Sequence, residues 1–448
     1  MISYKIYNKL MPLLRRQYNI NLSNGLIAIL MLSIMYSFGT FGLLNLFGIR
    51  QEIQILLIGL LSFLFIIVKP RCDTNLAGMV LMFSGLLAIG GLIHSGQLTW
   101  IIEALMLIII LYFIYYATSE KILFLAKALV ISSLFFCTLV LVAHVYYKIN
   151  PNDVSNANFY IYDSTVGNSQ IYTGNLIDWI SFTSGDGYVF GGEVYVRMKG
   201  YSNEPSSTII HYLAPAIIAF IIGGTYTYIG ITMILINIIA IGSVTSYIIL
   251  ILAAVIFVLG LVFRKNISIL FYFIGVILLI TILNPNIIVN IFSHFSNVAI
   301  EYFDFDLIGR KLGDDNIGER NLGMINGLYL ILNSPFGYSV SLLGPGAGLL
   351  YLTSAMTGWI GLILVFKFFR KLIKLISYNF SMEEKNMARF SFCLILSLLF
   401  IVLFVSGYGW SRPPGVIILI LIFKMMDLSS QTNLSYKHEF ASVNKSCT

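Results

Sequence analysis

Long apolar runs, separated by short polar or charged segments, make up most of the chain. A helix rises about 1.5 Å per residue, so roughly 20 apolar residues cross the ~30 Å hydrocarbon core of a membrane. The pattern predicts about 12 transmembrane helices, within a range of 11 to 13 because little separates the seventh run from the eighth. The predicted spans are residues 24–46, 53–69, 75–93, 99–118, 122–146, 206–223, 226–243, 245–263, 267–283, 347–366, 390–408 and 413–426.

Two polar segments, residues 147–205 and 284–346, are far longer than a turn and contain most of the acidic residues. Long loops in a compact protein usually carry function. The first loop interleaves Asn, Ser, Gly and Asp with aromatic residues such as Tyr160, Tyr172 and Trp179. This composition suits sugar binding, and it is equally typical of a tyrosine-rich belt at the membrane interface.

The second loop should contain two short helices. Residues 288–302 form an amphipathic stretch that we expect to lie in the outer interface of the membrane. A further helix is predicted from Ile317 to Asn333, which is too short and too polar at its start to span, so it re-enters the membrane or lies flat. The Ser-Pro-Phe-Gly sequence of residues 334–337 should end it.

The composition supports a membrane protein. Of the 448 residues, 58% are hydrophobic and 10% charged, which leaves too little polar surface for a soluble globule of this size. We therefore interpret residues 1–448 as a single all-α polytopic membrane domain that begins with an uncleaved signal anchor. The net charge of +7 is spread between the apolar runs instead of forming one patch, so membrane topology explains it better than nucleic-acid binding.

The distribution of basic residues predicts the orientation. If the N-terminus is cytoplasmic, 19 of the 27 Lys and Arg residues lie inside, as the positive-inside rule requires, and both termini are cytoplasmic. Both long loops then face the outer side of the membrane, which is the periplasm in a bacterial inner membrane. The eight basic residues on the outer side are Arg50, Lys148, Arg197, Lys199, Arg310, Lys311, Arg320 and Arg412.

Five of these outer cations are candidates for anion binding. Arg197 and Lys199 lie near the end of the first loop, and Arg310, Lys311 and Arg320 lie in the second. Arginine matches phosphate with a planar fork of donors, and two or three together can hold a diphosphate without a metal ion. The alternative is that these side chains pair with loop carboxylates or reach lipid headgroups.

Four further residues could carry chemistry. Glu204 precedes Pro205 at the start of a predicted span, where it could act as a base or cap the helix. His211 follows two turns later and is either functional or a core residue. Asp304 and Asp306 have the spacing of a carboxylate pair for a divalent cation, but so short a pattern arises often by chance. We therefore expect no metal site and no cofactor.

The chain resembles the bacterial O-antigen polymerases of the Wzy type and the related O-antigen ligases. The resemblance rests on the plan of about 12 spans with two long outer loops and on two segments. The first runs from Arg197 to Ala214 and contains Asn-Glu-Pro; the second runs from Arg320 to Gly337 and ends in Asn-Ser-Pro-Phe-Gly. The ligases carry a His-Asn pair shortly before a Gly-x-x-Gly span, and no His stands at the corresponding place before Gly358, which favours a polymerase.

The resemblance implies an inner-membrane glycosyltransferase whose donor and acceptor are oligosaccharides linked to undecaprenyl diphosphate. Arg197 and Arg320 would contact the diphosphate. The resemblance leaves the base unassigned, and among the residues themselves Glu204 is the strongest candidate. Membrane lipid and a chain-length regulator protein are further expected partners. Substrate contacts are expected from Lys199, Arg310, Lys311, His211 and Tyr338.

Two other functions stay open. An O-antigen ligase, which transfers finished glycan to lipid A-core, would share the fold and differ in its acceptor. A flippase for lipid-linked glycans would place cations inside its spans, whereas nearly all cations here lie in loops, with Lys127 as the main basic exception. The absence of a sequence repeat relating the two halves also speaks against a transporter.

Overall fold

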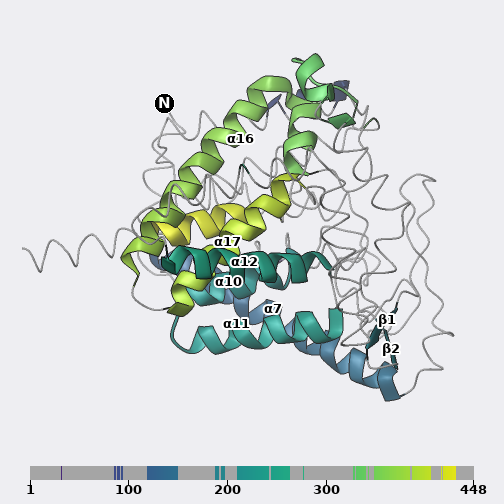
Figure 1. The fold of residues 1–448 in the computed structure, drawn as a ribbon, viewed down its shortest axis with the longest axis vertical. Helices are drawn as coiled ribbons and strands as arrows, with labels where there is room; N and C mark the ends of the chain where they lie inside the picture. Colours follow the sequence, from purple (N-terminus) through teal and green to yellow (C-terminus); the bar gives the residue numbers. More distant parts are fainter. Residues whose placement is uncertain are drawn as a thin grey trace, which may run out of the picture.

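The computed structural model describes 119–149, 187–190, 193–196, 209–241, 244–262, 348–383, 386–404 and 417–429, most of 326–339, and isolated positions elsewhere, including several of 85–93. These residues are mainly helical (Figure 1). The helices are α7 (Ser119–Ile149), α10 (Leu213–Ile222), α11 (Thr225–Ile236), the π-helical turn η2 (Asn237–Ile241), α12 (Val244–Val262), α16 (Leu349–Met382), α17 (Asn386–Phe404) and an unlabelled last helix over residues 417–429.

Four helical segments in the described part are long and apolar enough to cross a membrane. They are Ile122–Tyr146, Thr245–Val262, Leu349–Met382 and Asn386–Leu403. Together with the composition, they indicate an α-helical membrane protein, as the sequence predicts. The total of about 12 spans, the cytoplasmic location of both termini and the course of the two long loops stay predictions.

The outward faces of two helices are apolar, which fits contact with lipid. On α12, Ile251, Val255, Val258 and Val262 are each at least half exposed and recur at helical spacing. On α7, Ile131, Phe135 and Val142 are exposed in the same way. A helix in water would carry polar side chains on this face, whereas a helix that is apolar on all sides is typical of a membrane span.

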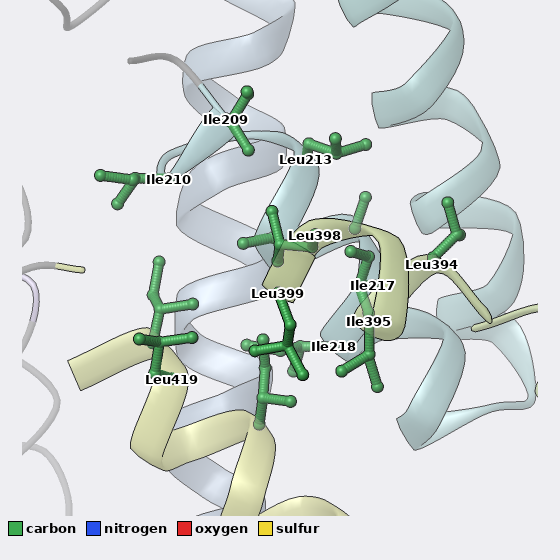
Figure 2. Close-up of a cluster of buried hydrophobic side chains, with 14 of the residues drawn as sticks. Ile209, Ile210, Leu213, Ile217, Ile218, Leu394, Ile395, Leu398, Leu399 and Leu419 are labelled. Carbon is green, nitrogen blue, oxygen red and sulfur yellow. The ribbon is translucent and has the colours of Figure 1, made fainter. Parts of the chain in front are cut away.

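Helix α10 lies at the centre of the main hydrophobic core. It contacts α7, α11 and α17, and α17 in turn contacts α12 and α16. Figure 2 shows apolar side chains of the Ile209–Ile218 segment beside those of α17, including Leu394 and Leu398. Since most of α10 is buried on all sides, the residues that enter it, from Ile209 onward, are held in the protein interior.

Helices α10 and α11 form a tight antiparallel pair. The turn between them is Gly223-Gly224, whose φ angles of 75° and 60° favour glycine over any residue with a side chain. Gly230 of α11 faces α10 so closely that an added Cβ would lie 2.9 Å from the carbonyl oxygen of Ala216. Small residues at such a crossing let two membrane helices approach each other.

The first long loop contains a two-stranded hairpin that the sequence analysis does not predict. Strands β1 (Gly187–Phe190) and β2 (Glu193–Val196) pair antiparallel, with Tyr188 opposite Tyr195. Aromatic and β-branched residues favour strands, and the intervening Gly-Gly is typical of a two-residue hairpin turn. Strand β2 contacts α7, and Figure 1 shows the hairpin beside one end of that helix.

Candidate functional site

Two of the eight predicted site residues, His211 and Tyr338, lie in the described part of the chain. The other six lie outside it: Arg197, Lys199, Glu204, Arg310, Lys311 and Arg320. Described elements nevertheless bracket the first predicted segment. Arg197 directly follows Val196, the last residue of β2, and Ile209 opens the buried turn before α10. The segment between them is therefore tied at one end to a strand that contacts α7 and at the other to the helix core.

His211 lies in the turn of residues 209–212 that leads into α10. Its side chain is buried, and its ring packs edge-on against Tyr212, with the ring centroids 6.5 Å apart. Tyr212 is itself fully buried, and its carbonyl oxygen accepts the first helical hydrogen bond, from the amide of Ala216, at 3.1 Å. His211 is thus enclosed at the start of a helix, immediately after the segment that carries the predicted catalytic residues.

The start of α10 differs from the sequence prediction, and Pro215 explains why. The predicted span begins at residue 206, whereas α10 begins at Leu213. Proline has no amide hydrogen, so Pro215 cannot bond to the carbonyl of His211, and its ring would crowd that carbonyl in a continuous helix. In the first turn of a helix these costs vanish, which favours a start near residue 213. Glu204, nine residues earlier, therefore does not cap α10.

Tyr338 belongs to a small polar cluster in the interior. Its hydroxyl lies 3.0 Å from Oγ of Ser354 and 3.1 Å from the carbonyl oxygen of Tyr351, and its amide donates to the carbonyl of Ala355 at 2.8 Å. Burial raises the pKa of Tyr338 to about 12, and the hydrogen bond with Ser354 opposes that rise. Tyr338 therefore stays neutral at physiological pH and ties the segment before it to α16.

The segment before Tyr338 ends as the sequence predicts. Residues 329–333 are helical, and the next four residues form a turn in which the amide of Gly337 donates to the carbonyl of Ser334 at 3.1 Å. Gly337 has a φ of 99°, which a residue with a side chain rarely adopts. Phe336 is 90% exposed at the tip of this turn, a position suited to a membrane interface.

This turn packs against a kink in α16. Gly358 breaks the helical backbone with φ 60° and ψ −154°, and an added Cβ would collide with the carbonyl oxygen of Pro335. The amide of Trp359 donates to that same oxygen at 3.0 Å, and its indole N–H donates to the carbonyl of Ile331 at 2.6 Å. The two N–H groups of Trp359, which follows the kink, thus fix the helix that ends at Asn333 and the turn after it against α16.

Within the described part of the chain, His211 and Tyr338 belong to different regions of the interior. His211 is flanked by members of the main core, whereas Tyr338 belongs to a second cluster with Ile331, Leu350, Tyr351 and Ala355. Among the described residues, no three His, Cys, Asp or Glu side chains lie together so that they could hold a metal ion. A scan of protein-family models, a search of curated proteins and a search of solved structures each found no match to this chain.

Sequence reasoning missed two features of these surroundings. The hairpin before Arg197 was signalled by alternating aromatic and β-branched residues on either side of Gly-Gly. The partners of Tyr338 had no sequence signal, because Tyr351 and Ser354 are 13 and 16 residues away and meet it only through the fold. Both features position the predicted segments.

Proposed function

We propose that the protein polymerises oligosaccharide units linked to undecaprenyl diphosphate into O-antigen or a similar surface polysaccharide, on the periplasmic face of the inner membrane. The observation that carries the proposal is the pair of segments that resemble the polymerases, Arg197–Ala214 and Arg320–Gly337. The first segment ends in the buried start of α10, and the second ends in the turn that is hydrogen-bonded to α16. Because each segment is attached to the helices at one end, residues from both loops could be held together in one site.

In the proposed reaction, the growing glycan is the donor and a fresh lipid-linked unit is the acceptor. A hydroxyl oxygen of the acceptor attacks the anomeric carbon of the donor, and the bond from that carbon to the diphosphate breaks. Arg197 and Arg320 stabilise the charge that accumulates on the departing undecaprenyl diphosphate, the largest expected catalytic effect. Glu204 removes the proton from the attacking hydroxyl. No nucleotide sugar takes part.

The remaining predicted residues have supporting roles in this proposal. Lys199, Arg310 and Lys311 add positive charge beside the diphosphate, and His211 lies at the boundary between the site and the helix core. Tyr338 has a positioning role, because its hydroxyl is directed to Ser354 and to the carbonyl of Tyr351 within the protein. Holding both lipid-anchored substrates at one interface supplies the proximity that a reaction between two membrane-bound molecules needs.

Broken helices are the observation that favours a flippase as the second candidate. Helix α10 has 10 residues, about 15 Å, which is half the thickness of the hydrocarbon core. The kink at Gly358 interrupts α16, and α11 ends in the π-helical turn η2. Transporters use such discontinuous helices to bind substrates within the membrane. The same features also suit a membrane enzyme that takes a lipid-linked substrate.

Deletion of the gene, followed by separation of surface glycans by size, tests the proposal. A polymerase deletion leaves lipopolysaccharide that carries a single repeat unit. Loss of all attached glycan would contradict a polymerase and indicate a ligase or a flippase. The location of the lipid-linked units then separates these two, because units that accumulate on the cytoplasmic face identify a flippase and units on the periplasmic face a ligase.

A further inference from the structure

Helix α11 ends in a π-helical turn that buries an amide side chain. The turn η2 contains five residues and opens with Asn237, whose side chain is 1% exposed. Within the described part of the chain, neither Nδ2 nor Oδ1 of Asn237 has a hydrogen-bond partner. A buried amide without partners destabilises a fold, and π-helical turns inside helices occur often at functional sites. The buried side chain of Asn237 therefore lowers the stability of the fold, and the packing around it gives no reason for an amide at this position.

The backbone around this amide is well fixed. The amide hydrogen of Asn237 is shared between the carbonyls of Met233 and Ile234, so the turn continues α11 without a break. Tyr247 of α12 donates its hydroxyl to the carbonyl of Ile238 at 2.7 Å, which ties the turn to the next helix. Ser246, beside Tyr247, is also 1% exposed, and its hydroxyl has no hydrogen-bond partner among the described residues.

The helices that carry Asn237 and Ser246 favour a neutral ligand. Residues 225–262, which include α11, η2 and α12, contain no Asp, Glu, Lys or Arg. A phosphate would need cationic partners, and a divalent cation would need carboxylates. An amide that offers two N–H donors and one acceptor, with a hydroxyl that both donates and accepts, instead matches the hydroxyl groups of a sugar.

The position of η2 relates it to the first predicted catalytic segment. Both η2 and β2 contact α7, and Arg197 directly follows β2 in the chain. The opposite end of α11 is marked by Tyr226, which contacts Lys127 of α7 and lies 11 residues, roughly 16 Å, before Asn237. A ligand that reaches both Arg197 and Asn237 would extend from the loop into the helices.

We propose that Asn237 and Ser246 form a carbohydrate subsite that binds hydroxyl groups of the lipid-linked glycan. The inference rests on the proposed function, because it takes that glycan as the substrate. Arg197 and Arg320 recognise the diphosphate, which is shared by all undecaprenyl-linked units, whereas the amide and hydroxyl contact the sugars. The subsite therefore contributes to the choice of repeat unit and leaves recognition of the lipid carrier to the arginines.

The test uses the full-length protein in phospholipid nanodiscs and two separate probes. The first is undecaprenyl diphosphate without sugar. The second is the oligosaccharide released by mild acid from the lipid-linked units that accumulate in cells lacking the gene. Binding by wild type is compared with Asn237→Leu, Ser246→Ala and the control Thr232→Val. Thr232 lies on the exposed face of α11, where its hydroxyl donates to the carbonyl of Tyr228, so its replacement should change neither affinity.

For Asn237→Leu we expect an unchanged or higher melting temperature, because a buried unpaired amide is replaced by an apolar side chain of similar size. Its affinity for the free oligosaccharide should fall about tenfold, while its affinity for undecaprenyl diphosphate stays within twofold of wild type. Ser246→Ala should likewise lower the affinity for the oligosaccharide. If Asn237→Leu does not fold, Ser246→Ala alone decides the matter.

Unchanged oligosaccharide affinity in the folded variants would overturn the subsite. So would a lower melting temperature with unchanged affinity, which would assign Asn237 a structural bond, for example to a buried water. If wild type binds undecaprenyl diphosphate but not the oligosaccharide, the subsite is wrong and the proposed function stands. If wild type binds neither probe, the proposed function is wrong and the subsite falls with it.

Discussion

The ammonium nitrogen of Lys127 lies 5.6 Å from the centre of the Tyr226 ring, which brings the third turn of α7 beside the first turn of α11. Lys127 is one of the basic residues that the charge distribution assigns to the cytoplasmic side. A cation over an aromatic face contributes about 0.5 to 2 kcal/mol, depending on solvent access. The contact therefore links the turn at Gly223-Gly224 to the same side of the membrane as the start of α7.

Reporter fusions test this orientation. A reporter active only outside the cytoplasm should be active when fused after Asp178 or Asp315, since both lie in predicted outer loops. It should be silent after Lys385, between α16 and α17, and also after Gly224, which adjoins Tyr226. Activity after Lys385 would overturn the whole topology, whereas activity after Gly224 alone would show that α10 does not return to the side of Lys127.

Replacement of Gly358 by Ala should destabilise the protein. The φ and ψ angles of Gly358 lie in a region that is essentially limited to glycine, and the new Cβ would meet the carbonyl oxygen of Pro335. We expect a loss of about 2 to 4 kcal/mol, seen as a lower melting temperature in detergent. Gly85→Ala is the control, because an added Cβ there has open space. Equal melting temperatures for the two variants would show that the kink is not required.

Removal of the Tyr338 hydroxyl should loosen the turn from α16. Tyr338→Phe loses the contacts with Ser354 and the Tyr351 carbonyl, at a cost of about 1 kcal/mol. Thermal unfolding in detergent measures this difference, and Tyr329→Phe, at an exposed position on the same segment, is the control. A variant as stable as wild type would exclude the anchoring role of the hydroxyl.

The advantage of wild type over Tyr338→Phe should also depend on pH. The folded-state pKa of Tyr338 is raised to about 12 from the ordinary value of 10. Ionisation therefore favours the unfolded state, so the hydroxyl's contribution is complete below pH 10 and declines as the pH rises from 10 to 12. Unfolding temperatures of both proteins across this window give the measurement. A difference that grows with pH would contradict the buried, neutral hydroxyl.

The reaction should require no divalent metal, because several arginines could neutralise the diphosphate by themselves and the Asp304-Phe305-Asp306 pattern is too short to indicate a metal site. Purified protein given lipid-linked units should lengthen them in the presence of a chelator. Loss of product that magnesium or manganese restores would make the aspartate pair the site and reduce the arginines to a secondary role.

Local sequence rules accounted for the parts of the fold that local chemistry controls. The Ser-Pro-Phe-Gly turn was predictable because proline fixes its own φ angle and glycine permits a positive φ. Pro215 could have indicated where α10 starts, and the Gly-Gly between two β-rich runs could have indicated the hairpin. Hydropathy alone shows neither feature. An apolar run predicts membrane burial better than it predicts where a helix begins.

Tertiary contacts set the remaining features, and a single sequence does not contain them. Nothing near Tyr338 indicates that Ser354 will be its partner, and nothing near Asn237 indicates a π-helical turn or the burial of its amide. The charge pattern that selected Arg197 and Arg320 depends instead on which loops face outward. The candidate diphosphate site is therefore a prediction from topology and resemblance, supported by the anchored ends of its two segments.

The size of the surface glycan in Arg197→Ala and Arg320→Ala cells shows whether these two arginines bind the diphosphate. Each substitution should remove one charge-assisted contact to the diphosphate, at a cost of about 3 kcal/mol, on the order of a hundredfold in rate. Arg→Lys at either position should rescue poorly, because a point charge cannot reproduce the bidentate fork. Arg50→Ala, in the short turn between the first two predicted spans, is the control and should keep normal chains.

With the protein inserted at normal levels, both alanine variants should carry a single repeat unit, while Arg50→Ala should show the full ladder of chain lengths. A normal ladder of long chains in the Arg197→Ala and Arg320→Ala cells, at wild-type expression, would contradict the two-arginine site.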